Sequence, residues 1–487
     1  MLALPCILAT MDLTVLNLAV PRLSAELKPS ASQLLWIMDI YGFFIAGSLI
    51  TMGTLGDRIG RRKLLMIGAA AFGTASMFAA FSKSAAILIA ARALLGVAGA
   101  TLAPSTLSLI RNMFHDAHER TVAIGIWVTC FSVGAAIGPL LGGILLEHFW
   151  WGSVFLLNVP VMILLLLLGP SLLPEFRDPN AGRLDLLSAG MSLTAVLFVI
   201  YGLKAIAEHG LRSLPVFSIV FGFAVGTLFV RRQKKLDDPL IDLRLFGTRA
   251  FTAALCLNMF GCFIAFGAFF FTGQYLQLVL GLSPLKAGLW STPSSAAFIA
   301  GSMWTPQLVR RLRPAAIIAG GLVIAAFGFI LLAMVDRSAN LGLLVAALSI
   351  YSLGISPIFT LSTDLIVGSA PPEKAGAAAS LSETSTEFGG ALGMAILGSI
   401  GTALYRREIS AALPLDLPAA AAEAARATLG GALSVARELP DAAGAALLNN
   451  AHRAFGHALR MTSMSCAFIS LMMAVLTLGL LRSDQKK

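Results

Sequence analysis

Charged residues are scarce in this sequence, and long stretches have none. Asp, Glu, Lys and Arg make up 12% of the 487 residues, about half of the roughly 25% that soluble domains carry. Residues 64–82 and 154–173, for example, contain no charge. Apolar stretches of about 20 residues are what a helix needs to cross a hydrocarbon core about 30 Å thick. The shortage of charge therefore excludes an ordinary soluble protein and predicts an all-α membrane protein.

Other features are also missing. The five cysteines fall inside apolar runs without the spacing of metal ligands or of a disulfide framework, and are interpreted as small buried residues. No G-x-x-x-x-G-K sequence could cradle a nucleotide phosphate, which argues against a primary pump. No cleavable signal peptide is visible. The first apolar run begins at Met1 and is short, so a native start upstream of Met1 stays open.

Apolar runs and the residues that interrupt them predict about fourteen spanning helices. Their approximate ranges are 1–20, 34–55, 64–81, 85–110, 121–146, 152–173, 185–207, 214–232, 250–280, 286–309, 315–335, 341–366, 376–403 and 456–481. Lys and Arg cluster in the loops that follow the even-numbered helices. The positive-inside rule then places both termini in the cytoplasm, on a multi-pass protein of the cell (inner or plasma) membrane. These loops also explain the net charge of +10 without a nucleic-acid partner.

The order of these helices predicts three parts. Residues 1–173 form a six-helix bundle, 174–249 an inserted helix pair with cytoplasmic loops, and 250–487 a second six-helix bundle. The last part contains a long loop at about 404–455, rich in alanine and interrupted by prolines. It is predicted to lie outside the cell as short surface helices, since long loops translocate largely regardless of charge. Its role is open between a structural cap and a gating or partner-binding element.

A first motif, GTLGDRIGRRKLL at 53–65, lies between the second and third predicted helices. Its glycines permit a tight turn, and its aspartate can pair with arginines and cap a neighbouring helix. A basic cluster alone would only anchor the loop in the cytoplasm, whereas the full spacing is much more specific. The motif residues are Gly53, Asp57, Arg58, Gly60, Arg61 and Arg62.

A second motif, GAAIGPLLGG at 134–143, lies in the fifth predicted helix. Glycines spaced four apart let two helix backbones approach closely, and a proline bends the helix. This spacing alone usually indicates only packing. The motif residues are Gly134, Gly138, Pro139, Gly142 and Gly143.

Five ionisable residues in predicted spanning helices are the candidate site residues. Asp12 lies in the first helix, Asp39 in the second and Arg92 in the fourth. Glu383 and Glu387 share one face of the thirteenth. A charge at such depth costs roughly 2.5–3.5 kcal/mol on insertion scales and indicates a functional site. The alternatives are helix-capping or inter-helix bonds for the carboxylates and snorkelling to the interface for Arg92.

Buried carboxylates suit the exchange of a cation for a proton. An apolar environment favours the neutral form of a carboxyl group, and a hydrophobic cation that arrives favours the ionised form and expels the proton. Aromatic faces attract desolvated cations by on the order of 2 kcal/mol. The predicted aromatic lining is Trp36, Tyr41, Trp127, Trp290 and Phe388, each with a lipid-facing position as its alternative.

Together these patterns resemble the major facilitator superfamily, in particular its drug:proton antiporters with fourteen spanning helices. The resemblance covers nearly the whole chain. It implies two six-helix bundles around a mid-membrane site, with 53–65 as a cytoplasmic latch between the halves and a proton-coupling role for Arg92. It also identifies 134–143 as the antiporter motif associated with exporters. Phe298 stands where some relatives carry an acidic residue, which favours monovalent over divalent cations.

The resulting prediction is a proton-coupled multidrug efflux transporter. It would export lipophilic organic cations, such as quaternary ammonium compounds, ethidium and fluoroquinolones, by drug/H⁺ antiport with alternating access. No enzyme activity, cofactor or metal is predicted, and the proton is the coupling ion. The expected partners are drugs, protons and membrane lipid, and the expected state is a monomer. The alternatives are a proton-coupled metabolite symporter and an exporter of lipids or lipid-linked compounds.

Overall fold

The structure is a computed structural model, and all regular secondary structure that it describes is helical. It describes residues 2–29, 31–177, 185–209, 212–236, 239–335, 341–413 and 417–480. Within these residues, twelve helices are long and apolar enough to cross a membrane. The predicted all-α membrane fold is therefore confirmed. Helices α1 (Leu4–Leu27) and α11 (Pro284–Val309) have the necessary length but are not among the twelve, so the count of fourteen stays a prediction.

The helices fall into three groups along the chain. The N-terminal bundle comprises α1, α2 (Ala31–Ile59), α3 (Arg61–Ala80), α4 (Ala85–Met113), α5 (Ala117–His148), α6 (Ser153–Leu156) and α7 (Asn158–Leu172). The inserted hairpin comprises α8 (Leu186–His209) and α9 (Ser213–Gln233). The 3₁₀ turn η1 (Leu243–Gly247) leads into the C-terminal bundle, which comprises α10 (Arg249–Gln274), the π-helical turn η2 (Tyr275–Val279), α11, α12 (Pro314–Ala333), α13 (Leu341–Ser369), the 3₁₀ turn η3 (Pro372–Lys374), α14 (Ala375–Ala412), α15 (Ala419–Ala427), α16 (Leu429–Glu438) and α17 (Asp441–Leu480).

Local sequence signals set several helix ends. The Ser84 side chain accepts a hydrogen bond from the amide of Ile87 and caps α4. Asp116 caps α5 by accepting from two backbone amides at 2.9 Å. The bond from the Glu119 amide, above all, holds the pKa of Asp116 below its usual value. The predicted single helix at 152–173 is interrupted at Leu157, where α6 ends and α7 begins.

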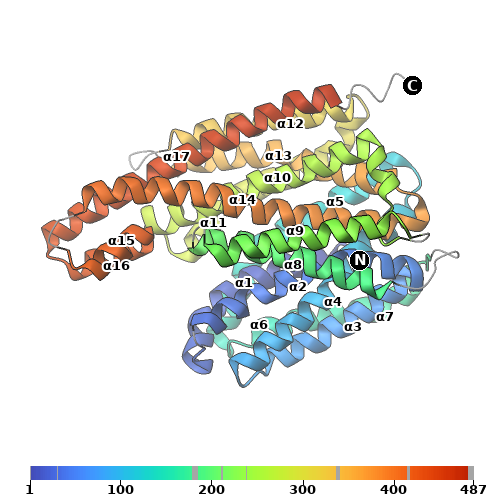
Figure 1. Cartoon of the computed structure of the whole chain (residues 1–487), viewed down its shortest axis with the longest axis horizontal. Coiled ribbons are helices and arrows are strands. Elements are labelled where there is room, and N and C mark those ends of the chain that lie inside the picture. Colours follow the sequence, from blue (N-terminus) through green and yellow to red (C-terminus); the bar gives the residue numbers. More distant parts are fainter. Residues whose placement is uncertain are drawn as a thin grey trace.

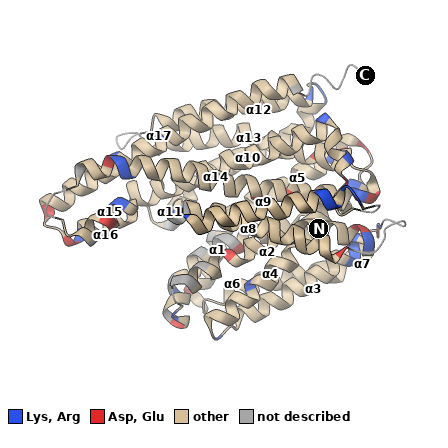
Figure 2. Cartoon of the chain, in the orientation of Figure 1, with Lys and Arg blue, Asp and Glu red and all other residues tan. Residues whose placement is uncertain are grey.

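The two bundles lie side by side, with their long helices roughly along one axis (Figure 1). We call the end that holds the α2–α3 turn the latch end, and the end that holds α15 and α16 the cap end. In the view of Figure 1, the bundles are close together at the latch end and spread apart toward the cap end. Figure 2 shows Lys and Arg gathered mainly at the latch end, with a smaller mixed group of charges on the cap-end projection.

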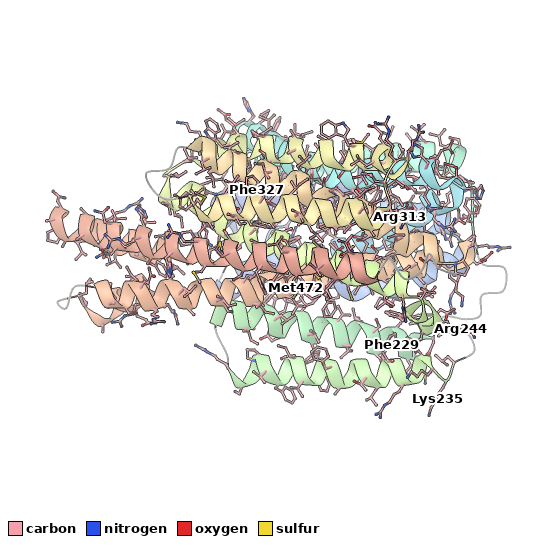
Figure 3. All side chains as sticks on the ribbon, turned by 90° about the horizontal axis from the view of Figure 1, so that it is seen from above. Phe229, Lys235, Arg244, Arg313, Phe327 and Met472 are labelled. Carbon is pink, nitrogen blue, oxygen red and sulfur yellow. The ribbon has the colours of Figure 1, made fainter. Side chains whose placement is uncertain are left out.

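The inserted hairpin lies along one side of the molecule (Figure 3). Its helix α8 packs against α2 of the N-terminal bundle and α14 of the C-terminal bundle. A small apolar cluster joins the three helices through Phe43, Ala46, Val196, Ile200 and Ala391. The hairpin therefore covers the seam where α2 meets α14. The opposite seam is formed by α5 and α11.

The cap end carries a helical projection rather than the long loop expected at 404–455. Helix α14 continues to Ala412 and α17 starts at Asp441, so only the segment between them, with α15 and α16, connects the two. The Tyr405 hydroxyl donates to the backbone oxygen of Ala425 at 3.0 Å and ties α14 to this segment. The prediction placed the helix ends wrongly because the alanine-rich flanks have high helix propensity and continue each helix past its apolar part. The predicted short surface helices are present as α15 and α16.

Candidate functional site

The deepest charges in the N-terminal bundle form an ion pair. Nη1 of Arg92 in α4 lies 3.1 Å from Oδ2 of Asp12 in α1, and the two side chains are 0% and 3% exposed. The amide of Asn158 in α7 lies 3.4 Å from the other Asp12 oxygen and 3.2 Å from the Ser76 hydroxyl in α3. Two helices thus contact the carboxylate of α1, and α3 is linked to it through Asn158. The structure brings together two residues that the sequence singled out separately.

The Arg92 guanidinium is also packed against aromatic rings. Its Cζ lies 5.2 Å from the centroid of Tyr41 and 6.0 Å from that of Phe155. Nε and Nη2 of Arg92 and the Tyr41 hydroxyl are buried with no hydrogen-bond partner among the described residues. Buried polar atoms are normally paired, so each such atom needs an explanation. This guanidinium therefore has donors to spare for a second acceptor.

Two further predicted carboxyl groups lie in the C-terminal bundle. Glu383 and Glu387 lie one helical turn apart on α14, and both are partly buried. Neither forms a hydrogen bond or ion pair with a described residue. The Asn258 amide in α10 donates to the Ser385 hydroxyl at 2.9 Å and to the Ser382 backbone at 3.1 Å, which fixes this part of α14. Burial without a strong partner makes these two carboxyls the most available acids of the predicted set.

The fourth predicted carboxylate has a partner that sequence reasoning missed. Nζ of Lys204 in α8 lies 2.6 Å from Oδ1 of Asp39 in α2, and both side chains stay about a quarter to a third exposed. The same ammonium lies 4.8 Å from the ring centroid of Phe43. A signal for Lys204 was present, because it is a lone cation in an apolar helix and such residues are rare in spanning segments.

The five predicted aromatic residues are not equivalent. Tyr41 and Trp127 are buried, at 1% and 2% exposed, and Trp127 donates to the Thr106 hydroxyl at 3.0 Å. They contribute to packing in this conformation. Trp36 contacts Phe43 near the seam covered by the hairpin. Phe388 packs against the cluster of residues at that seam. Trp290 is 43% exposed on α11.

At the latch end, Asp57 joins the two bundles. Its carboxylate accepts from the backbone amides of Gly376 and Ala377, each at 2.9 Å, at the start of α14. Arg61 pairs with Asp57 at 2.8 Å and donates to the backbone oxygen of Pro372 at 2.6 Å. An acid at a helix N-terminus is stabilised by the free amides there. A Cβ atom at Gly53 would collide with the backbone oxygen of Gly376, so the close approach requires glycine.

The rest of the first motif acts inside the N-terminal bundle. Gly60 has φ of 112°, and a Cβ there would lie 2.8 Å from the Glu175 carboxylate. Glu175 accepts from the amides of Arg62 and Lys63 at the start of α3. The Arg62 side chain donates to the backbone oxygens of Pro170 and Leu173 at the end of α7. Cations are favoured at such helix ends. Arg58 has interactions of its own.

A second contact between the bundles lies nearby. Asp364 in α13 accepts from Nε of Arg120 at 2.7 Å and from the Thr121 hydroxyl at 2.6 Å, both in α5. Arg111 donates to the backbone oxygen of Val367 at 3.3 Å. These bonds join the two bundles at the latch end. The structure is therefore closed at that end.

The second motif brings α5 against α1. A Cβ at Gly134 would collide with the backbone oxygen of Ile7, and one at Gly142 would lie 2.7 Å from Val15. Gly138 is buried, whereas nothing lies within 4 Å of a Cβ at Gly143. The side chain of Pro139 lies outside the described part of the structure. Because α1 carries Asp12, these glycines also position the buried ion pair.

A cavity of about 620 Å³ lies at the cap end, away from the predicted carboxylates. It is lined by Glu408, His452, Arg453, His457 and Arg460, among others. None of the predicted site residues contributes to it. Within the described residues, no group of three or more His, Cys, Asp or Glu side chains could hold a metal ion.

Comparison with known proteins decides the family. A family model described as Major Facilitator Superfamily matches residues 2–394. The chain belongs to the Major Facilitator Superfamily. It is a transporter rather than an enzyme, and it is a multi-span membrane protein. The predicted resemblance to this superfamily is confirmed.

Several curated superfamily members are similar over most of their length. The chain is 43% identical over 470 residues to the multidrug efflux pump LfrA of Mycolicibacterium smegmatis, which covers 96% of this chain and 93% of that protein. It is 39% identical over 448 residues to the methyl viologen resistance protein SmvA of Salmonella typhimurium, with 91% and 90% covered. It is 31% identical over 463 residues to the tetracenomycin C resistance and export protein of Streptomyces glaucescens, with 93% and 85% covered.

Solved structures share the superfamily fold. The human organic anion transporter TETRAN matches with a TM-score of 0.60 at 15% identity, covering 98% of this chain and 97% of that one. The proton:xylose symporter XylE matches with a TM-score of 0.58 at 15% identity, covering 81% and 86%. At such identities the likeness concerns the fold alone.

Proposed function

We propose that this superfamily member is a proton-coupled multidrug efflux transporter that exports lipophilic organic cations in exchange for protons. The observation that carries the proposal is the presence of buried or partly buried acids in the spanning helices of both bundles. A neutralised pair, Asp12 with Arg92, lies in one bundle, and two carboxyls without a partner among the described residues, Glu383 and Glu387, lie in the other. Acids in such a setting exchange protons for cations because a cation and a proton compete for one negative charge.

The sequence relatives support export as the direction of transport. LfrA is named a multidrug efflux pump, and the protein of Streptomyces glaucescens is named for both resistance and export. The chain matches both relatives over more than nine-tenths of its own length. The substrates are then small drugs, and the organic cation is the class that acidic side chains favour.

The proposed cycle uses each group in turn. A cation that approaches Glu383 and Glu387 stabilises their ionised forms and releases a proton. The Tyr41 ring centroid lies 5.2 Å from Cζ of Arg92, so this ring packs beside the Asp12–Arg92 pair. The spare donors of Arg92 accommodate the changing charge.

Alternating access follows from the contacts at the latch end. The bonds from Asp57 and Asp364 hold the bundles closed there and must break before a substrate can enter from that side. Lys and Arg gather at the latch end (Figure 2), and cytoplasmic loops carry an excess of these residues. We therefore assign the latch end and both termini to the cytoplasm, with the protein in the cell membrane. In this assignment the present conformation is closed toward the cytoplasm.

Transport in proteoliposomes tests the proposal. The purified full chain is reconstituted with a pH-sensitive dye inside, and ethidium or tetraphenylphosphonium is added under an imposed pH gradient. We expect cation movement coupled to proton counterflow, and loss of both when a protonophore is present. Glu387→Gln removes the charge for which both ions compete and should abolish the coupled movement. Glu147→Gln, an exposed acid near the cap end of α5, is the matched control.

Two results would contradict the proposal. Cation movement that ignores the pH gradient and the protonophore would exclude proton coupling. Movement of a metabolite together with the proton, in the same direction, would favour a symporter instead.

A further inference from the structure

The seam between α2 and α14 holds a cation that belongs to the chain itself. Lys204 reaches this seam from α8, and its Nζ lies 2.6 Å from Oδ1 of Asp39. The Lys204 and Asp39 side chains are 26% and 30% exposed, so the pair is not sealed in the core. An exposed pair of this kind contributes little net stability, typically about 0–1 kcal/mol. Stability alone therefore does not account for placing a lysine in an apolar helix.

The groups around this ammonium are those that recognise an organic cation. The face of Phe43 lies 4.8 Å from Nζ, in the range where a ring attracts a positive charge. Trp36 extends the aromatic surface, with its ring centroid 6.0 Å from that of Phe43. Glu387 directly precedes Phe388 on α14, and Phe388 packs against the apolar cluster that contains Phe43. A carboxylate and an aromatic surface thus adjoin one positive charge.

The inserted hairpin is what brings this charge to the seam. Helix α8 touches both bundles, and an apolar cluster that includes Phe43, Val196, Ile200 and Ala391 fixes it there. The end of the hairpin at the latch side is fixed as well, since Asp185 accepts from the Ser188 hydroxyl and from Arg232 of α9. The Ser188 bond is the main reason that the pKa of Asp185 lies below its usual value. The position of Lys204 is therefore set by packing along the whole helix.

We propose that Lys204 is a tethered competitor of the transported cation, which must displace its ammonium from Asp39 in order to bind. This inference rests on the proposed function and adds to it a specificity-determining residue from the inserted hairpin. Because the ammonium is bound to the chain, it returns when the substrate leaves. It thus limits affinity and favours release. A neutral solute does not compete for the same charge and is not affected.

The alternative is that Lys204 serves only to hold the hairpin against α2. The two hypotheses predict different effects on stability and on cation affinity when the charge is removed. If Lys204 is only a tether, removing its charge lowers stability and leaves cation affinity unchanged or weaker. If Lys204 is a competitor, removing its charge makes cation binding tighter, but only while Asp39 keeps its charge.

Equilibrium binding of tetraphenylphosphonium to the full chain in lipid nanodiscs separates them. Lys204→Met keeps much of the apolar stem and removes the ammonium, and we expect about two- to fivefold tighter binding. Lys204→Arg keeps a competing cation and should show no such gain. Lys83→Met removes an exposed charge between α3 and α4 and should leave binding unchanged. In Asp39→Asn/Lys204→Met the gain should disappear.

Several outcomes would overturn the inference. These are unchanged or weaker binding in Lys204→Met, or a gain that persists when Asp39 is neutralised. Lys204→Gln serves as the second variant if Lys204→Met does not fold, since its amide still bonds Asp39 without charge. If the wild-type chain exchanges cations for protons but Lys204→Met binds the cation no more tightly, this inference alone is wrong. Wild-type chain that binds no cation at all would defeat the proposed function and this inference together.

Discussion

Asp12 of α1 and Arg92 of α4 neutralise each other in the interior of the N-terminal bundle, although they lie 80 positions apart in the chain. The two charged atoms are 3.1 Å apart, and both side chains are almost completely buried. Removing one member of a buried pair leaves an uncompensated charge, which costs more than the pair itself contributes. The pair therefore ties α1 to α4, and in the proposed function it links proton exchange to this packing.

The first prediction concerns this pair. Asp12→Asn should abolish drug export and lower the free energy of unfolding, by about 3–5 kcal/mol if Arg92 stays charged and unpaired. Asp12→Asn/Arg92→Gln should recover part of the stability because no lone charge remains, but it should not recover export. Thermal melting in detergent and ethidium efflux from cells, normalised to protein level, measure the two effects. Efflux by Asp12→Asn equal to that of the parent would remove this carboxylate from the mechanism.

The second prediction concerns the close approach of α2 to α14. Gly53→Ala places a Cβ against the backbone oxygen of Gly376, which cannot move aside as a flexible side chain would. The latch end should therefore open. Spin labels at Met113→Cys and Leu312→Cys, in a background without the five native cysteines, should report longer distances between the bundles.

Gly42→Ala is the matched control for that experiment. It lies on the same helix, but nothing lies within 4 Å of its Cβ position. Its label distances should match those of the parent. If Gly53→Ala also kept the parent distances, the contact at Gly376 would not control closure.

The third prediction concerns the second contact at the latch end. Arg120→Gln and Asp364→Asn each break the 2.7 Å ion pair between α5 and α13, whose side chains are only 14% and 12% exposed. Both variants should shift the equilibrium toward an open latch end. In a double-mutant cycle, contacting residues couple by about 0.5–3 kcal/mol, so the double variant should not add the two single effects. The free energy of opening follows from the populations of short and long label distances, and simple additivity of its changes would show that the two residues act separately.

The fourth prediction concerns the packing of α5 on α1. Gly134→Ala introduces a Cβ against the backbone oxygen of Ile7 and should push α1 away from α5. Since α1 carries Asp12, we expect protons to leak through the transporter without drug. The rate of pH collapse in drug-free proteoliposomes measures the leak. Gly143→Ala has open space at its Cβ position and should not leak protons. Equal leak in both variants would show that close packing at Gly134 is irrelevant.

The sequence predicted the helices where apolar length alone decides them and failed where it does not. The extension of α14 to Ala412 was missed because alanine-rich, partly polar sequence forms a helix without being apolar enough to cross a membrane. At Leu157 the helical hydrogen bonding is interrupted because Pro160 has no amide to donate to the preceding turn, but Ser153–Leu172 still forms one span, as predicted. The error at α14 concerns a helix end, which local composition determines weakly.

The sequence analysis selected the candidate residues but not the partners that the structure gives them. Asp12 and Arg92 were each singled out because a charge in a spanning helix is costly. Their mutual contact depends on how α1 and α4 pack, and no spacing between the two residues encodes that. Lys204 was missed, although the same rule would have found it. Its partner Asp39 lies on another helix 165 positions away.

The amino-acid sequence by itself determined that this chain spans a bilayer, because helices in hydrocarbon require long stretches with few charged residues. It also determined which ionisable side chains must find partners there, since hydrocarbon offers none. The tertiary structure alone decided which partner each one has: Arg92 for Asp12, Lys204 for Asp39, and no described residue for Glu383 and Glu387. The physical reason is that a charge is costly wherever it is buried, whereas its neutralisation depends on distances between helices that only packing sets.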